Sequence, residues 1–381
     1  MERRLITTDC HIAPPYSLVE ELPESYREHF PRLDRRADGA YVVQPLQREM
    51  VAMMGDAGRG MKVDDEPRAL ARAAVGNVCD EAAPSFDAAE QLADLERDGV
   101  YGAVLIGRLS AFDFDTPPEI DAAYCKLVND WQAETWGRYL DRVAPGIYLP
   151  FKDVGASVKE LERAAGMGLR PALLPDGIFD TPYHLPAWEP LWEAADSLGV
   201  PITMHVGGMR MPGAYREREL THRHAGSHFI GWYNQCVGMG ETLGWLTFSG
   251  IFERYPNLHV VMTEGYAAWL AFAIQFYDHH WEGRFGATSH MMGGDAGKLE
   301  APPSLYLKRQ AHATFMWDPV AVRVRDVTGL DCLLWGNDYP HREGSFPFSQ
   351  EWVDKQFAGV PEDEVDIMVR GNAARIFNID I

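Results

Sequence analysis

Residues 259–281 read HVVMTEGYAAWLAFAIQFYDHHW, a short apolar run followed by a longer segment with helical spacing. The run His259–Thr263 has the length and β-branched content of a buried strand, whereas the apolar residues of Tyr266–Trp281 recur with the period of a helix. A buried strand that leads straight into a helix is the repeating unit of α/β folds with a parallel sheet. Glu264 lies where the predicted strand ends.

The same unit recurs along the whole chain. Strands are predicted at Leu5–His11, Gly102–Ile106, Val143–Pro150, Arg170–Leu174, Pro201–His205, His259–Thr263, Ala313–Met316 and Cys332–Gly336. Helices are predicted at Asp87–Arg97, Pro118–Tyr139, Ser157–Ala165, Trp188–Leu198, Gly240–Arg254, Tyr266–Trp281, Pro319–Val327 and Pro361–Phe377. This alternation predicts an α/β fold, a closed (β/α)8 or TIM barrel, as a single domain over residues 1–381.

Three long segments lie outside these units. A (β/α)8 barrel needs about 250 residues, so a chain of 381 residues has a large surplus. The surplus falls at residues 30–84, 206–239 and 282–309, each of which follows a predicted strand. Segments in that position leave the C-terminal rim of a barrel, where active sites are found. We expect residues 30–84 to form a lid and the other two segments to be long loops.

The overall charge excludes some classes of partner. The chain has 35 Lys and Arg residues against 56 Asp and Glu residues, a formal net charge of −21. A strongly acidic surface repels polyphosphates, so nucleic acid is not an expected partner. The apolar stretch Tyr266–Tyr277 is too short to cross a bilayer, and the N-terminus has no apolar signal region. The five cysteines form no CxxC pair, which favours reduced thiols. We expect a cytoplasmic protein that acts on a small molecule.

Metal-competent side chains lie at the ends of four predicted strands. They are Asp9 and His11 at the end of the first strand, His205 at the end of the fifth, Glu264 just after the sixth, Asp338 just after the eighth, and His341 on the loop that follows. A single histidine at a strand end is more often a structural residue, and a single acidic residue there is often a helix cap. Together, however, two histidines with one or two carboxylates are the ligands of a catalytic Zn²⁺, Mn²⁺ or Fe²⁺ ion with room for water. We predict one divalent metal ion, with Zn²⁺ placed before Mn²⁺ and Fe²⁺.

Several of these motifs carry a family resemblance. The segments TDCHIAPP (8–15), LADLERDGV (92–100), PITMHVGG (201–208), SGIFERYPNLHVVMTEGYAAWL (249–270) and LLWGNDYPH (333–341) occur in that order. Taken together, the chain resembles the amidohydrolase-related family of the amidohydrolase superfamily. That branch includes aminocarboxymuconate-semialdehyde decarboxylase and the resorcylate- and dihydroxybenzoate-type decarboxylases. The resemblance implies a homodimer and a mononuclear metal held by Asp9, His11, His205 and Asp338.

The chain departs from that family pattern at two positions. Many members begin with HxH or ExH, whereas this chain has Asp9-Cys10-His11. The decarboxylases place a catalytic histidine at the end of the sixth strand, where this chain has Glu264. The fourth strand, within RPALLPD (170–176), offers no lysine for a bridging carbamate, which disfavours a two-metal centre of that kind.

These residues predict a metal-dependent hydrolase or carbon–carbon lyase. A bound ion can polarise a substrate carboxylate or carbonyl, and Asp338, Glu264 and His341 are the predicted catalytic groups. His228, Trp232, Tyr266 and Trp317 are predicted to bind a small, aromatic, carboxylate-bearing substrate, although rings at these positions would also suit a hydrophobic core. One alternative is acyl chemistry on an ester or amide, including an intramolecular condensation that closes a ring in secondary metabolism. Another is a barrel that binds a ligand without catalysis.

Overall fold

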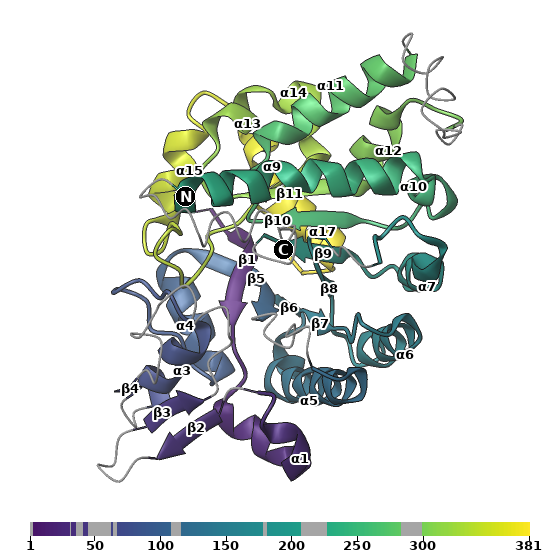
Figure 1. The fold of residues 1–381 in the computed structure, drawn as a ribbon. Helices are drawn as coiled ribbons and strands as arrows, with labels where there is room; N and C mark the ends of the chain where they lie inside the picture. The colour runs from purple at the N-terminus through teal and green to yellow at the C-terminus, as the bar shows by residue number, and fades with distance from the viewer. Residues whose placement is uncertain are drawn as a thin grey trace.

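The computed structural model describes residues 3–30, 32–35, 41–44, 62–63, 67–107, 116–177, 181–206, 227–282 and 299–381. Parallel strands form its centre (Figure 1). They are β1 (Leu5–Ile12), β5 (Val100–Gly107), β6 (Val143–Pro145), β7 (Ile147–Tyr148), β8 (Ala172–Pro175), β9 (Ile202–His205), β10 (Val260–Thr263), β11 (Ala311–Phe315) and β12 (Leu333–Trp335). Each of the predicted strands is present.

The strands form a ring. One parallel sheet has the order β1-β5-β6 and another has the order β12-β11-β10-β9-β8-β7. Gly146 alone separates β6 from β7, so the two are halves of one broken strand that joins the sheets. On the other side, a parallel bridge pairs Cys10 with Tyr339, and the Thr8 hydroxyl donates to the carbonyl oxygen of Trp335 at 3.1 Å. The predicted TIM barrel is thereby confirmed.

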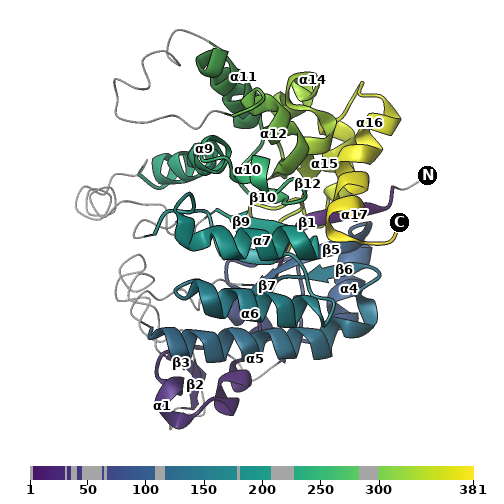
Figure 2. The same ribbon diagram turned by 90° about the vertical axis from the view of Figure 1, so that its right-hand side faces the viewer.

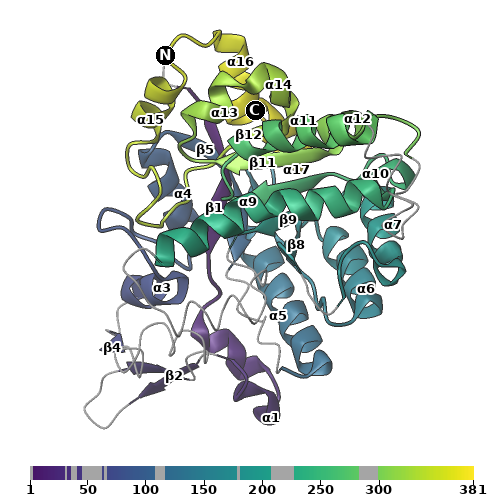
Figure 3. The ribbon, with the colours of Figure 1, turned by 45° about the horizontal axis from the view of Figure 1, so that its top comes forward.

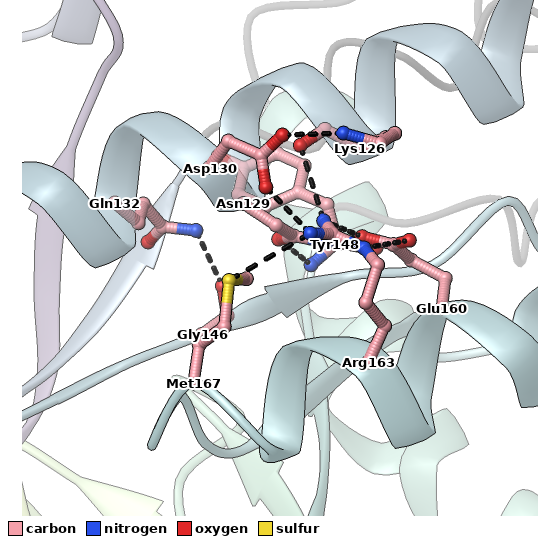
Figure 4. Close-up of polar contacts among 9 residues, drawn as sticks. All are labelled: Lys126, Asn129, Asp130, Gln132, Gly146, Tyr148, Glu160, Arg163 and Met167. Atoms are coloured by element: carbon pink, nitrogen blue, oxygen red, sulfur yellow. Dashed lines mark hydrogen bonds and ion pairs between the residues drawn. The ribbon is translucent and has the colours of Figure 1, made fainter.

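Polar side chains from the helices satisfy the backbone at the broken strand (Figure 4). The side-chain NH2 of Asn129 donates to the carbonyl oxygen of Tyr148 at 2.9 Å, and Oδ1 of Asn129 accepts from the backbone N–H of Tyr148 at 2.8 Å. The Gln132 amide donates to the carbonyl oxygen of Gly146 at 2.7 Å. Buried backbone groups need such partners, so these two amides replace the ladder bonds that the break removes.

The helices around the barrel mostly match the predicted positions. They are α4 (Ala88–Arg97), α5 (Pro118–Trp136), α6 (Val154–Ala165), α7 (Glu189–Leu198), α9 (Ser227–Phe248), α10 (Ile251–Arg254), α11 (Ala268–Glu282), α13 (Pro319–Arg323), α14 (Arg325–Thr328), α16 (Glu362–Asp366) and α17 (Asn372–Phe377), with a π-helical turn, η7 (Ile367–Gly371), between the last two. Figure 2 shows α5, α6 and α7 side by side and both termini at the same end of the molecule.

Three helices differ from the sequence-based expectation. α9 begins at Ser227, inside the segment 206–239 that we expected to be a loop, and it packs against α11 (Figure 3). Its four internal glycines weaken the helical signal, and packing overrides that propensity. α12 (Pro303–Gln310) begins in the expected loop 282–309 and ends one residue beyond it. α15 (Ser349–Gln356) was missed because SQEWVDKQ is largely polar and lacks a clear apolar stripe.

The segment 30–84 contains regular structure of its own. β2 (Arg32–Arg35), β3 (Tyr41–Gln44) and β4 (Lys62–Val63) form a small antiparallel sheet, and α3 (Pro67–Val75) follows it. Before this sheet lie η1 (Tyr16–Glu21) and α1 (Glu24–Arg27). Figure 1 places the sheet and α1 at the opposite side of the molecule from α11 and α14. The end of the segment returns to the barrel, where Val78 forms an antiparallel bridge with His341.

The helices and the cysteines can be compared with what the sequence predicts. Among the helices of the described ranges, none combines the length and apolar character required to traverse a bilayer. All five cysteines are buried free thiols.

Candidate metal centre

Four barrel strands bring their C-terminal ends together and deliver the predicted metal-competent residues to one place. Asp9 and His11 lie on β1 with one residue between them, so their side chains share a side of the strand. His205 is the last residue of β9, and Glu264 follows the last residue of β10. Asp338 lies three residues beyond β12.

The side chains lie within direct reach of one another. Nε2 of His11 is 3.3 Å from Oδ1 of Asp9 and 3.1 Å from Oδ1 of Asp338. Nε2 of His205 is 3.5 Å from the same Asp9 oxygen and 3.1 Å from Oε2 of Glu264. The ligand atoms of Asp9, His11, His205 and Glu264 all lie within 4.8 Å of one another, which makes these four residues a candidate metal site. Glu264 therefore shares a site in which the sequence had placed only Asp9, His11, His205 and Asp338.

Within the described part of the chain, several of these polar atoms are buried without a hydrogen-bond partner. They are Oδ1 and Oδ2 of Asp9, Nε2 of His11, Nε2 of His205, Oε1 of Glu264 and Oδ2 of Asp338. The short nitrogen–oxygen distances in the cluster thus do not come with hydrogen-bond geometry. A buried polar atom that lacks a partner is costly, and a bound cation satisfies a cluster of such atoms when they lie close together. The residues fit a divalent metal ion.

The histidine rings are held in the orientation that a ligand requires. Nδ1 of His205 lies 2.6 Å from the carbonyl oxygen of Val206, which leaves Nε2 to face the cluster. The His11 ring stacks on that of His341, with centroids 4.1 Å apart, and it meets the His205 ring edge-on at 4.9 Å. Nδ1 of His341 lies 3.0 Å from Oδ1 of Asp338. His341 thus joins the cluster through Asp338 and His11.

Burial controls the protonation of two of the carboxyl groups. Burial raises the pKa of Asp338 to about 7, although its interaction with His341 opposes this shift, and the charge of Asp9 adds to it. Burial, together with the charges of Asp338 and Asp9, raises the pKa of Glu264 well above its usual range. Without a cation, these two groups therefore hold protons near neutral pH, and a bound cation would displace them.

Asp9 behaves in the opposite way. Burial alone would raise the pKa of Asp9, but interactions with His11 and His205 outweigh it and hold that pKa below its usual range. Burial lowers the pKa of His11. Burial acts on His205 in the same direction, but the nearby Asp9 raises the pKa of that imidazole overall. Asp9 is thus the ionised anchor of the cluster.

The turns that carry Glu264 and Asp338 are held in unusual backbone conformations. Glu264 and Asp338 have φ values of 62° and 54°, in the left-handed region that residues with a side chain rarely adopt. The carboxylate of Asp318, which follows β11, accepts hydrogen bonds from the backbone N–H groups of Ala267 and Ala268, both at 2.9 Å. This fixes the start of α11 just after Glu264. Backbone strain of this kind clusters at functional sites.

A second set of contacts fixes the Asp338 turn. The Asn337 amide donates to Asp98 at 3.2 Å, and the Asn337 backbone N–H donates to the Thr7 hydroxyl at 2.9 Å. Gly336 lets β12 approach β1 closely, because a Cβ atom there would lie 2.8 Å from Cβ of Asp9. Asp9 and Asp338 are therefore held together by backbone packing as well as by the cluster itself.

The predicted substrate-binding residues lie in different surroundings, and their role stays a prediction. Trp232 is half-buried against the core, and Tyr266, 43% exposed, follows Glu264 by two residues. Trp317 packs edge-on against Trp352 with centroids 5.7 Å apart, which is a structural contact. The side chain of His228 lies outside the described part of the chain.

Glu343 is a neighbour of the cluster that the sequence reasoning missed. Its carboxylate lies within 4.8 Å of ligand atoms of Glu264 and Asp338. The Asn77 amide donates to Oε2 of Glu343 at 2.6 Å. Its position two residues beyond His341 was a usable signal, but the pairing of its loop with residues of the 30–84 segment was not readable from the sequence.

Comparisons with known proteins agree with this architecture. The amidohydrolase family model matches residues 6–379. The crystal structure of 5-carboxyvanillate decarboxylase from Sphingomonas paucimobilis is 22% identical, with a TM-score of 0.68 and 99% of each chain covered. The 2,6-dihydroxybenzoate decarboxylase from Rhizobium is 17% identical, with a TM-score of 0.66 and 99% of each chain covered.

A third similar structure contains a metal. It is 5-carboxyvanillate decarboxylase from Novosphingobium aromaticivorans, complexed with manganese and 4-hydroxy-3-methoxy-5-nitrobenzoic acid. It is 16% identical, with a TM-score of 0.70, and the alignment covers 99% of this chain and 96% of that one. At such identities these likenesses show a shared fold.

Proposed function

Because the chain belongs to the amidohydrolase family, we propose that it is a metal-dependent enzyme that decarboxylates or hydrolyses a small, aromatic, carboxylate-bearing molecule. The observation that carries this proposal is the set of partnerless buried nitrogen and oxygen atoms at the C-terminal ends of the strands. That is the face of a TIM barrel on which catalysis takes place. The aromatic acids bound in structures of similarly folded decarboxylases, 2,6-dihydroxybenzoate in one and 4-hydroxy-3-methoxy-5-nitrobenzoic acid in another, support the choice of substrate class.

The proposed ligands are Asp9, His11, His205 and Asp338, with Glu264 beside them. When bound, a divalent ion there supplies a Lewis acid that polarises a carboxylate or carbonyl oxygen of the substrate. The mixed nitrogen and oxygen ligands suit Zn²⁺ or Mn²⁺. Manganese in a similarly folded decarboxylase supports Mn²⁺, and the ligand types support Zn²⁺ equally.

We assign proton transfer to the Asp338–His341 pair. Oδ1 of Asp338 and Nδ1 of His341 are 3.0 Å apart, close enough to share a proton. The Asp338 side chain is fully buried, whereas that of His341 is 16% exposed, so the imidazole can exchange that proton with a substrate or solvent. Glu264 faces His205 from the other side of the cluster and orients the substrate there.

Glu264 also favours a second candidate function. The decarboxylases that the sequence resembles use a neutral imidazole at the end of the sixth strand, and a carboxyl group offers different hydrogen bonds. We therefore keep acyl chemistry on an ester or amide, including a ring-closing condensation, as the second candidate. The homodimer implied by the family resemblance and the lid role of residues 30–84 stay predictions.

The test is carbon dioxide release from a panel of hydroxybenzoates by protein reconstituted with Mn²⁺ or Zn²⁺. Release by the loaded enzyme, abolished by chelation and in Asp338→Asn, supports decarboxylation. Ester or amide turnover without carbon dioxide supports the second candidate. Purified protein that binds neither ion at a stoichiometric level contradicts both and favours a barrel that binds a ligand without catalysis.

A further inference from the structure

A carboxylate triad lies beside the candidate metal site. Glu264, Asp338 and Glu343 each offer an oxygen within 4.8 Å of the other two. Two of these residues also contact the histidines of the first site, since Oε2 of Glu264 lies 3.1 Å from His205 and Oδ1 of Asp338 lies 3.1 Å from His11. The third, Glu343, lies on the loop after β12.

The position of Glu343 is built by the fold. The Asn77 amide donates to Oε2 of Glu343 at 2.6 Å, and the Arg342 backbone N–H donates to the Asn77 carbonyl oxygen at 3.1 Å. Beside them, Val78 and His341 form an antiparallel bridge. The Arg342 side chain pairs with Asp80 at 2.7 Å. Glu343, though exposed, is therefore held next to the buried carboxylates by a paired backbone rather than by a free loop.

Glu264 and Asp338, the two buried members of the triad, each have a second carboxylate oxygen that does not face a histidine. Glu264 and Asp338 are 3% and 0% exposed, and each directs one carboxylate oxygen to a histidine. The other oxygens, Oε1 of Glu264 and Oδ2 of Asp338, are buried and have no hydrogen-bond partner in the described ranges. Buried oxygens of this kind are costly unless a cation or a hydrogen-bond donor lies beside them.

We propose that Glu264, Asp338 and Glu343 bind a second divalent cation next to the first, with Glu264 and Asp338 shared between the two ions. The ligand set is all oxygen, so the second ion is a hard one such as Mg²⁺ or Mn²⁺. This inference rests on the proposed function of the first site. It differs from the carbamate-bridged pair that the sequence disfavoured, because no lysine is needed. Two ions that share carboxylates are typical of hydrolytic enzymes, so the second ion favours hydrolysis or its reverse.

The test is a Mn²⁺ titration of the full-length protein, with bound metal measured after equilibrium dialysis and the Mn²⁺ spectrum recorded by electron paramagnetic resonance. Wild type is expected to reach about two ions per chain, with the second ion giving an exchange-coupled signal. Glu343→Gln is expected to stop at about one ion and to lose that signal. Glu351→Gln, an exposed change on α15, is the matched control and is expected to behave like wild type.

A second variant separates ligand loss from altered folding. Asn77→Gly keeps the left-handed backbone, whose φ is 47°, but removes the amide that holds Glu343. We expect this variant to lower the affinity for the second ion about tenfold, while the affinity for the first ion stays as in wild type. Saturation of wild type at one ion, with Glu343→Gln identical to it, overturns the second site alone. Binding of no ion at all overturns the proposed function as well.

Discussion

This barrel contains two clusters of buried polar side chains, one between α5 and α6 and one at the C-terminal ends of the strands. They differ in how their buried polar atoms find partners. Between α5, α6 and the broken strand, Asn129 bonds to both backbone groups of Tyr148 and donates to Oε1 of Glu160 at 2.7 Å. At the C-terminal ends of the strands, both oxygens of Asp9 and Nε2 of His11 find no hydrogen-bond partner among the residues that the structure describes. A polar cluster that satisfies itself stabilises a fold, whereas one that leaves its atoms facing each other is built for something that binds there.

The largest expected effect comes from breaking the cluster at the strand ends. In His205→Ala we expect the affinity for Mn²⁺ or Zn²⁺ to fall more than about 100-fold, because even residues behind the ligands cost 10- to 100-fold. Metal at about 100 times its Kd should stabilise wild type by about 2.7 kcal/mol and leave the variant unchanged. Calorimetric metal titration and urea denaturation with and without metal measure these two quantities.

His259→Ala is the matched control for that change. His259 lies just before β10 and pairs with Nε2 of His312 at 2.9 Å. Its loss should lower the free energy of unfolding by about 1–3 kcal/mol and leave metal affinity unchanged. Equal loss of metal affinity in His205→Ala and His259→Ala would show that the strand-end cluster has no special role in binding metal.

The next effect comes from breaking the self-satisfied cluster. Asn129→Ala removes the amide that donates to the Tyr148 carbonyl and accepts from the Tyr148 backbone N–H, so we expect the free energy of unfolding to fall by about 3 kcal/mol. Metal stoichiometry should be unchanged. Urea denaturation and metal analysis of the same preparations check both statements. A stable variant that loses metal would contradict them.

The two clusters also differ in how far the sequence predicts them. Residues on strand ends follow from a period-two strand and an apolar run, so Asp9, His11, His205 and Glu264 were located from the pattern alone. The strands were found for the same reason. Glu343 and the Asn129 network depend on side chains from segments far apart in sequence, such as Asn77 with Glu343, and no local pattern encodes such pairs.

Asp121 of α5 is a third case. Its buried carboxyl oxygens resemble those of the metal-site cluster, but Asp121 is not among the residues grouped there. Both carboxyl oxygens are buried and accept no hydrogen bond from any residue that the structure describes; burial raises the pKa of Asp121 to about 7, opposed by the charge of Lys152. The folded protein thus keeps a proton that the unfolded chain releases near its ordinary pKa of 3.8. This contribution to stability is complete below about pH 4 and is lost as the pH rises through 7.

In Asp121→Asn that pH dependence should disappear. Between pH 5 and pH 8 wild type should lose about 2–4 kcal/mol more stability than the variant, measured by urea denaturation across the range. Asp130→Asn is the control, since its side chain is paired with Lys126 and Arg163 and those pairs lower its pKa. Asp130→Asn should lose as much stability between pH 5 and pH 8 as wild type does. Identical profiles for wild type and Asp121→Asn would refute the assignment.

The smallest effect is expected at the solvent edge of the α5–α6 cluster. Lys126 and Asp130 form a pair four residues apart, 2.6 Å from Nζ to Oδ2, with side chains 58% and 39% exposed. Exposed pairs of this spacing contribute about 0.3–0.5 kcal/mol, since water screens the charges. Lys126→Ala should therefore change the free energy of unfolding by no more than that, and less at high salt. A loss above about 1 kcal/mol would mean that Arg163, which also contacts Asp130, depends on Lys126 for its place, and the cluster would then extend to the surface.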